Sequence, residues 1–296
     1  MSGEGKGPEK AKEKERADIL LVRQGLAPSR EKAKAQIMAG QVYEGANRID
    51  KAGEMISVLK ELRVKGRQTP YASRGGLKLA KALEVFPIDL SGLVVLDIGA
   101  STGGFTDCAL QNGAAKVFAV DVGYGQLDWK LRQDPRVVVL EKTNARYLTP
   151  DAIGEDVDFV TIDVSFISLD KVLPPVPALL GAQGSGVALI KPQFEAGRGQ
   201  VGKKGVVKDP SAHREVFQKV LAVLPGVGLE AYGATWSPVT GPQGNIEYLL
   251  WFGKAAGPDG KSGGGGIDPR LCGEIIEEAF AALKRPKSGV YTPLKM

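Results

Sequence analysis

Residues 93–104 read LVVLDIGASTGG, an unbroken apolar run that meets an aspartate and then a glycine-rich turn. Such a run, bounded by Asp and Gly, is typical of a strand that is buried on both faces of a sheet. Similar runs follow at residues 116–123, 136–142, 157–164 and 186–192, separated by stretches of helical length. This alternation predicts a doubly wound α/β domain built on a parallel sheet.

Two further apolar runs, LEAYGATWS (229–237) and IEYLLWFG (246–253), lie close together after a predicted amphipathic helix at residues 209–224. Their short separation favours an antiparallel pair that completes the sheet. The single histidine, His213, lies in this helix without cysteine or histidine neighbours, so we interpret it as a structural residue. A closing helix is predicted at residues 268–284.

The N-terminal part of the chain predicts a small α+β domain with two helices and two short strands. Its first helix, ADILLVRQ, ends at Gly25, and its second begins after Ser29 as N-cap and ends at Gly40. The apolar positions of the second helix, which we expect to face the first, are Ala33, Ile37 and Met38. We divide the chain into a polar tail (1–15), this small domain (16–60), a basic linker (61–74) and the large domain (75–254). Residues 255–296 form a Gly-rich linker, the closing helix and a C-terminal tail.

Basic residues are unevenly distributed along the chain. There are 39 Lys and Arg against 34 Asp and Glu overall, but residues 60–81 hold seven basic residues and one acid. Such an excess attracts polyanions, although a solvated charged face would look the same. Cys108 and Cys272 have no paired spacing, so we predict neither a disulfide framework nor a metal site. The uncharged run 172–190 is interrupted by prolines and glycines, so no membrane span is expected.

Polar residues follow the ends of the predicted parallel strands, where open α/β sheets bind ligands. Asp121 ends the second strand and could accept hydrogen bonds from ribose hydroxyls, whereas an ordinary turn explains Asn144 after the third strand equally well. NAD enzymes, nucleotide enzymes and methyltransferases all use a glycine turn, and some such turns bind nothing. Asp97, before the first glycine, favours S-adenosylmethionine, which has no pyrophosphate for a helix N-terminus to hold. The predicted cofactor-binding residues are Asp97, Gly99, Ala100, Ser101, Thr102, Gly103, Gly104, Asp121, Asn144 and Asp163.

Two lysines and two carboxylates are predicted to meet at one cleft. Asp163 and Lys191 end the fourth and fifth strands, Glu247 opens the last strand on the same side, and Lys78 lies in the helix before the first strand. A purely structural cluster of salt bridges is the alternative, because buried charges need partners wherever they occur.

Several blocks of sequence, in one order between residues 16 and 254, closely resemble the TlyA, or hemolysin A, family of ribosomal RNA 2′-O-methyltransferases. They are YASRGGLKLAKAL, VLDIGASTGGFTDCALQNGA, AVDVGYGQLDWKLR, TNAR, IDVSFISL, IKPQFEAGRGQVGKKGVV and SPVTGPQGNIE. The large domain also resembles the wider FtsJ type, and the small domain resembles an RNA-binding domain of a ribosomal protein. Ser101 stands where many methyltransferases carry a glycine, which is compatible with this family.

The resemblance implies a Rossmann-like methyltransferase domain that uses S-adenosylmethionine and acts on a cytidine ribose of ribosomal RNA. The catalytic tetrad of the FtsJ type would fall on Lys78, Asp163, Lys191 and Glu247. Lys191 would act as the base, in a neutral form favoured by partial burial and by the nearby charge of Lys78. Asp163 and Glu247 would oppose this lowering of the Lys191 pKa, so their role would be to orient the amines and to hold Lys191 and the hydroxyl in register. No metal would be required.

We expect the partner to be ribosomal RNA or ribosomal subunits, recognised mainly by phosphate contacts and shape, since few aromatics, chiefly Tyr43, Tyr71 and Phe194, occupy the basic stretches. The residues predicted to contact RNA are Arg23, Arg30, Lys32, Lys34, Arg63, Lys65, Arg67, Arg74, Arg198, Lys203 and Lys204. We expect a cytoplasmic monomer. The alternatives are an RNA-binding ribosome-assembly factor without turnover, which an intact tetrad disfavours, and a haemolysin, for which the sequence lacks a membrane-inserting pattern.

Overall fold

The computed structural model describes residues 14–27, 29–64, 69–255, 267 and 269–284. The chain divides into two compact units, Met1–Gln68 and Thr69–Met296. The predicted N-terminal tail up to residue 13, the linker residues Lys65 and Arg67, the glycine run 263–266 and the tail after Lys284 lie outside the described residues.

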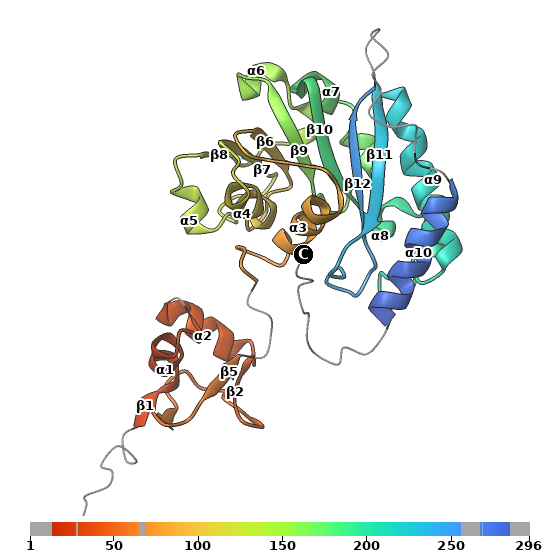
Figure 1. The fold of residues 1–296 in the computed structure, drawn as a ribbon. Coiled ribbons are helices and arrows are strands. Elements are labelled where there is room, and N and C mark those ends of the chain that lie inside the picture. The colour runs from red at the N-terminus through yellow and green to blue at the C-terminus, as the bar shows by residue number, and fades with distance from the viewer. Residues whose placement is uncertain (1–13, 28, 65–68, 256–266, 268, 285–296) are drawn as a thin grey trace, which may run out of the picture. The chain divides into compact units, whose positions relative to one another are not determined.

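The described residues of the first unit form two helices, α1 (Ala17–Arg23) and α2 (Arg30–Met38), and five short strands (Figure 1). Ser29 caps α2 as predicted, since its side chain accepts a hydrogen bond from the Lys32 backbone N–H. The expectation for Met38 is wrong: Ala33 and Ile37 are buried, but Met38 is 85% exposed. It is the last residue of the helix, one position past the buried stripe.

The first unit contains more strands than the two expected. The strand β1 (Lys14–Arg16) pairs with β4 (Met55–Ser57), while β2 (Val42–Glu44) lies between β3 (Asn47–Arg48) and β5 (Leu62–Val64) in an antiparallel sheet. β5 falls inside the stretch that the sequence predicted as a linker. Its three residues include an exposed arginine, so too little apolar pattern was present to indicate a strand.

A seven-stranded sheet forms the centre of the second unit, in the order β11-β12-β10-β9-β6-β7-β8. Its parallel strands are β6 (Val94–Ile98), β7 (Lys116–Val120), β8 (Val137–Leu140), β9 (Val157–Ile162) and β10 (Leu180–Ile190). β12 (Tyr248–Lys254) runs antiparallel to β10, and β11 (Leu229–Trp236) antiparallel to β12. The predicted parallel sheet with an antiparallel pair at its end is therefore confirmed.

Helices cover both faces of this sheet (Figure 1). Along β6, Leu96 and Ile98 pack in the core cluster that includes the helices α9 (Pro210–Gly226) and α10 (Pro269–Lys284), and Val95 packs in the cluster with α3 (Gly76–Val85) and α4 (Gly104–Gln111). The shorter helical segments are α5 (Trp129–Arg132), η2 (Ala145–Tyr147), α6 (Pro150–Ile153), η3 (Leu169–Lys171), α7 (Val176–Leu179), α8 (Pro192–Glu195) and η4 (Arg198–Gln200).

The outer helices contribute to the core rather than to the cleft. α10, the closing helix of the sequence analysis, packs against α9 and β11 and buries Cys272 and Ile276. His213 on α9 is fully buried between the Tyr248 hydroxyl, 2.6 Å from Nδ1, and the Val207 carbonyl, 3.0 Å from Nε2. Burial lowers the pKa of His213, which fits the structural role predicted for it.

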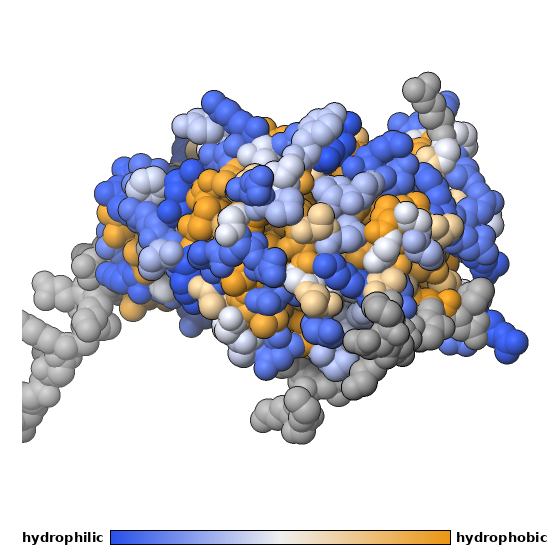
Figure 2. All heavy atoms as spheres, turned by 90° about the horizontal axis from the view of Figure 1, so that it is seen from above, coloured by the Kyte–Doolittle hydropathy of each residue, from blue (hydrophilic) through white to orange (hydrophobic). Residues whose placement is uncertain are grey.

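The surface of the protein mixes apolar and polar residues. Seen from above, hydrophobic patches are separated by hydrophilic side chains (Figure 2). Among the described residues, no helix has the length and apolar character needed to cross a membrane.

Candidate active site

Two adjoining cavities lie where the parallel strands end. One, about 520 Å³ in volume, has the larger number of charged side chains in its wall, and we call it the charged cavity. The other, about 430 Å³, has more aliphatic side chains in its wall, and we call it the apolar cavity. Gly99, Ser101, Asp163 and Ser165 line both. Because β6 lies between β9 and β7, the loops after these strands meet at one edge of the sheet. A ligand in one cavity would thus be next to a ligand in the other.

The charged cavity brings Lys78, Asp163, Lys191 and Glu247 together. Lys78 Nζ lies 2.8 Å from Glu247 Oε2 and 3.3 Å from Asp163 Oδ2. Lys191 Nζ lies 2.6 Å from Asp163 Oδ1 and 3.0 Å from Ser165 Oγ. The four side chains form a row of alternating charge, in the order Glu247, Lys78, Asp163, Lys191.

This row of charges is largely buried, so each group depends on its neighbours. Burial alone would raise the pKa of Asp163, but Lys78 and Lys191 outweigh it and lower that pKa. Burial would likewise lower the pKa of Lys78, but Asp163 and Glu247 raise it above the ordinary value. Asp163 contacts both lysines and lies between their charges.

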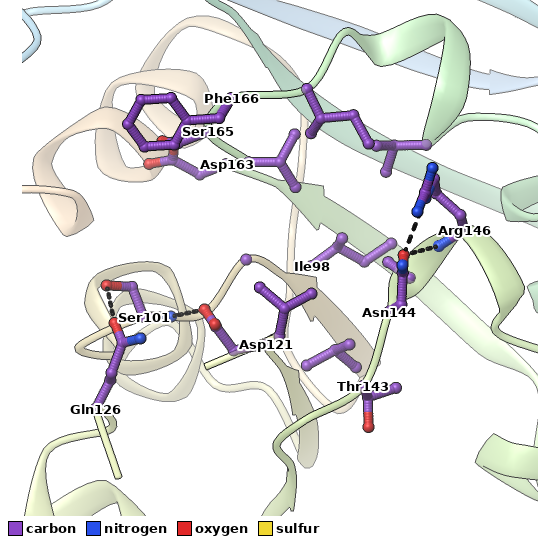
Figure 3. Close-up of a pocket in the computed structure, with 17 residues that line it drawn as sticks. Ile98, Ser101, Asp121, Gln126, Thr143, Asn144, Arg146, Asp163, Ser165 and Phe166 are labelled. Atoms are coloured by element: carbon purple, nitrogen blue, oxygen red, sulfur yellow. Dashed lines mark hydrogen bonds between the residues drawn. The ribbon is translucent and has the colours of Figure 1, made fainter. Parts of the chain in front are cut away.

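The apolar cavity is bounded by the turn after β6 and by the loops after β7, β8 and β9 (Figure 3). Asp121 Oδ2 accepts from the Ser101 backbone N–H (2.8 Å) and Oδ1 from that of Gly123 (2.7 Å). Asn144 caps η2 through the Arg146 backbone N–H. Ser101, with a φ of 49°, is one of the few described non-glycine residues in the left-handed region.

Glycine is required at the first position of the turn. Gly99 has a φ of 88°, and a Cβ there would lie 2.6 Å from the Asp163 carbonyl oxygen. Gly103, also at positive φ, packs against Leu131 and lines neither cavity. The other predicted turn residues, Ala100, Thr102 and Gly104, line the charged cavity.

Asp97 does not line either cavity, contrary to what its position at the strand end suggested. Its fully buried carboxylate accepts from the hydroxyls of Thr106 (2.6 Å) and Thr161 (2.8 Å). Burial, only partly offset by these hydroxyls, raises the pKa of Asp97 to about 6. The side chain therefore ties β6 to β9 and α4 beneath the glycine turn.

Glu195 and the loop after β9 were missed by the sequence analysis. Glu195 is buried and accepts from the Leu169 backbone N–H (2.7 Å) and from the Ser168 hydroxyl. It thus ties α8, which begins directly after Lys191, to the loop that carries Ser165 and Phe166. Phe166, at φ 62°, is 91% exposed and lines the apolar cavity. The partners of Glu195 lie about 26 positions earlier, so no local pattern indicated them.

The basic residues predicted to contact RNA occupy several places. Arg74 lines the charged cavity, and Lys203 and Lys204 lie exposed between Gly202 and Gly205, which are joined by a 2.8 Å backbone hydrogen bond. In the first unit, Arg23 and Arg30 pair with Glu15 and Asp18, and Lys32, Lys34 and Arg63 are exposed. Arg198 lies in η4. Within the described ranges, no group of three or more His, Cys, Asp or Glu residues could hold a metal ion.

Comparisons with known proteins agree with this geometry. Residues 71–254 match the FtsJ-like methyltransferase family and residues 15–58 match the S4 domain. The 16S/23S rRNA (cytidine-2′-O)-methyltransferase TlyA of Mycobacterium tuberculosis is 48% identical over 238 residues, which are 80% of this chain and 89% of that protein. The chain belongs to the TlyA family.

Other members of the TlyA family cover nearly the whole chain. YqxC of Bacillus subtilis, named as a candidate rRNA methyltransferase, is 51% identical over 281 residues, which are 94% of this chain and 98% of that protein. A solved structure of a hemolysin candidate from Streptococcus thermophilus matches with a TM-score of 0.71 and 46% identity, covering 92% of this chain and 97% of that one. The predicted family and fold, an FtsJ-like methyltransferase domain with an S4 domain before it, are confirmed.

Proposed function

We propose that this protein transfers a methyl group from S-adenosylmethionine to the 2′-hydroxyl of a cytidine ribose in ribosomal RNA. The observation that carries the proposal is the row of Lys78, Asp163, Lys191 and Glu247 beside a second, apolar cavity. The relatives named as rRNA methyltransferases support the choice of substrate.

The apolar cavity fits an adenosyl group. Its volume of about 430 Å³ lies within the usual range for small-molecule sites, and its wall includes Ile98, Val120 and Val164. Each Asp121 oxygen accepts one backbone hydrogen bond and keeps a second lone pair for a ribose hydroxyl. Gly99 has no side chain and lines this cavity, so a ligand can approach the backbone of the turn closely. Bound there, S-adenosylmethionine supplies an electrophilic methyl group on a sulfonium.

Lys191 is the residue best placed to accept the proton of the attacking hydroxyl. A ribose hydroxyl is a poor nucleophile at neutral pH, so it needs a positioned base within hydrogen-bond reach. With Lys191 in its neutral amine form, its Nζ would accept the hydroxyl proton while the ribose oxygen takes the methyl group, and S-adenosylhomocysteine would leave as a neutral thioether. Asp163, 2.6 Å from that nitrogen, then stabilises the ammonium that forms.

Lys78 and Glu247 position the base rather than exchange the proton. Lys78 bridges Asp163 and Glu247, and Gln193 Nε2 donates to Glu247 at 3.2 Å. This network fixes the Asp163 oxygen that Lys191 faces. An amine held in one place lowers the entropic cost of reaching the reactive geometry.

Binding of ribosomal RNA is assigned to the S4 domain and to the basic residues around the cleft. Arg74 lines the charged cavity and could contact the phosphate next to the target ribose. Lys203 and Lys204 project from a tight turn in the same unit. We expect binding to weaken steeply with salt, because such contacts release counterions from the RNA.

The test is incubation of isolated ribosomal subunits with labelled S-adenosylmethionine and the full-length protein, followed by mapping of ribose methylation. Lys191→Ala should reduce single-turnover methylation about 100- to 10,000-fold. Binding of S-adenosylmethionine and of subunits should change by less than about twofold. Lys171→Ala, at an exposed lysine that lines neither cavity, is the matched control.

Two results would contradict the proposal. An unchanged rate in Lys191→Ala would remove this residue from the role of base. If the wild-type protein binds subunits but incorporates no label into either, it acts as an RNA-binding assembly factor instead.

A further inference from the structure

A tyrosine between two arginines crosses the small sheet of the first unit. In the strand register, Tyr43 on β2 lies opposite Arg48 on β3 and opposite Arg63 on β5. Directly opposed residues of antiparallel strands point to the same face of a sheet. Arg48, Tyr43 and Arg63 therefore form one row across three strands, which we call the Tyr43 row.

The Tyr43 row lies on the solvent face of this sheet. Its sequence neighbours Val42 and Leu62, which point the other way, are 0% and 4% exposed and belong to the core of the unit. Arg63 is exposed, the side chain of Arg48 is 56% exposed, and Tyr43 is half-buried. The ring is thus fixed by the sheet but accessible from one side.

A hollow of about 380 Å³ lies beside the ring, lined by Tyr43, Gly45, Ala46, Arg63 and Val64. The turn between β2 and β3 presents only Gly45 and Ala46 here. A Cβ at Gly45 would meet nothing within 4 Å, so the tip of the hairpin leaves room. The hollow can receive a planar group without displacing the backbone.

The charge of the row selects the ligand. Arg48 Nε lies 2.6 Å from Asp50 Oδ1, so part of its charge is neutralised within the protein. Arg63 lines the hollow next to the tyrosine ring. An aromatic surface beside a guanidinium matches a nucleotide, whose base stacks on a ring and whose phosphate pairs with arginine. An unpaired nucleotide is required, because bases in an A-form helix are stacked on each other.

We propose that the Tyr43 row binds an unpaired nucleotide of single-stranded RNA, with the base on Tyr43 and the phosphate on Arg63. This inference rests on the proposed RNA substrate and names a recognition contact within it. On sequence grounds, we expect RNA to be recognised mainly through phosphate contacts and shape. The Tyr43 row adds a stacking contact to these.

The test is fluorescence anisotropy of a labelled ten-nucleotide oligocytidine with the full-length protein at several salt concentrations. Tyr43→Leu should weaken binding about tenfold and leave the salt dependence unchanged, since stacking releases no counterions. Tyr43→Phe keeps the ring and should bind within about twofold of wild type. Arg63→Gln should weaken binding and lower the log–log salt slope by about 0.7.

Controls separate the row from general effects. Arg136→Gln removes one exposed charge elsewhere on the chain and should weaken binding less than Arg63→Gln does. Circular dichroism should show the same folded content in Tyr43→Leu and wild type. Equal affinity of Tyr43→Leu and wild type, or an equal loss in Tyr43→Phe and Tyr43→Leu, would overturn the inference.

Methylation assays distinguish this failure from failure of the proposed function. With ribosomal subunits, Tyr43→Leu should raise KM for RNA severalfold and leave kcat unchanged. If wild type methylates and Tyr43→Leu has the wild-type KM and oligocytidine affinity, only the Tyr43 row is wrong. If wild type does not methylate, the enzymatic proposal fails while the oligocytidine measurement still decides the row.

Discussion

Two aspartates at the ends of neighbouring strands show how partners decide the state of a buried carboxylate. Asp97, near the end of β6, accepts hydrogen bonds from two threonine hydroxyls. Burial is the main reason why its pKa is raised to about 6. Asp163, which follows β9, has 18% of its side chain exposed, and two lysines lower its pKa. Neutral donors hold a carboxylate in place, whereas cations also keep it charged. Of the two carboxylates, only Asp163 contacts lysines and is therefore placed to stabilise an ammonium in the proposed reaction.

The largest expected effect is a difference in kcat between variants of Asp163 and Asp97. Asp163→Asn removes the negative charge between Lys78 and Lys191 and should lower kcat about 100- to 1,000-fold. Asp97→Asn should change kcat by less than about threefold at pH 7.5, because its side chain lines neither cavity. Single-turnover methylation of ribosomal subunits measures both. Equal losses in the two variants would contradict the division of roles.

The next effect concerns stability against pH. Because the folded-state pKa of Asp97 is about 6, above its ordinary value of 3.8, the folded protein holds the proton more tightly between these values. Stability should therefore fall as pH rises from about 4 to 6, by about 3 kcal/mol, and Asp97→Asn should remove this fall. Asp163, with a lowered pKa, stabilises the fold above about pH 4 and loses that contribution only on further acidification.

Urea unfolding followed by tryptophan fluorescence measures this pH dependence in the relevant unit, because Trp129, Trp236 and Trp251 all lie in the second one. Asp151→Asn, at an exposed position, is the control. An Asp97→Asn profile parallel to that of wild type between pH 4 and 7 would show that folding does not raise the pKa of Asp97.

A smaller effect tests the hydroxyl donors of Asp97. Thr161→Val keeps the shape of the side chain but removes one of the two hydroxyls, so the unfolding free energy at pH 7 should drop by about 2 kcal/mol. Thr161→Ser keeps the hydroxyl and should lose less. The same urea titrations apply, and a larger loss in the serine variant would mean that packing of the methyl group matters more than the hydrogen bond.

The smallest effect extends the comparison to a third buried carboxylate, Glu195, which lies next to the cleft. It accepts from two neutral donors, as Asp97 does, and also pairs with Lys219 at 3.5 Å. Glu195→Ala should lower kcat about tenfold with KM for RNA unchanged, since the loop carrying Ser165 and Phe166 loses its tie to α8. Glu195→Gln, which can still accept from the Leu169 N–H, should restore most of kcat in steady-state assays. Equal losses in both variants would exclude positioning through these hydrogen bonds.

The sequence predicted the sheet well, since its strands are buried on both faces and leave unbroken apolar runs such as 117–120 and 187–190. It predicted the first unit less well. There, strands of two or three residues leave too few positions for a pattern, so β5 was read as linker. The orientation of Met38 was predicted wrongly because this residue lies one position past the buried stripe of α2 and therefore faces solvent.

For the site, strand ends could be predicted but side-chain directions could not. The sequence placed Asp97 and Asp163 at the same edge, and only the folded structure shows that Asp97 points to Thr106 and Thr161. The contacts of Glu195 depend on residues brought close by tertiary packing, which leaves no local signal.

Glu247 contacts Lys78 across 169 positions of the chain and directly precedes β12, the last strand of the sheet in chain order. During synthesis, a nascent chain that has not yet released β12 from the exit tunnel can form the glycine turn but cannot complete the row of charges. We therefore expect newly made protein to become competent for reaction only near the end of its own translation, when almost the whole polypeptide is available to fold.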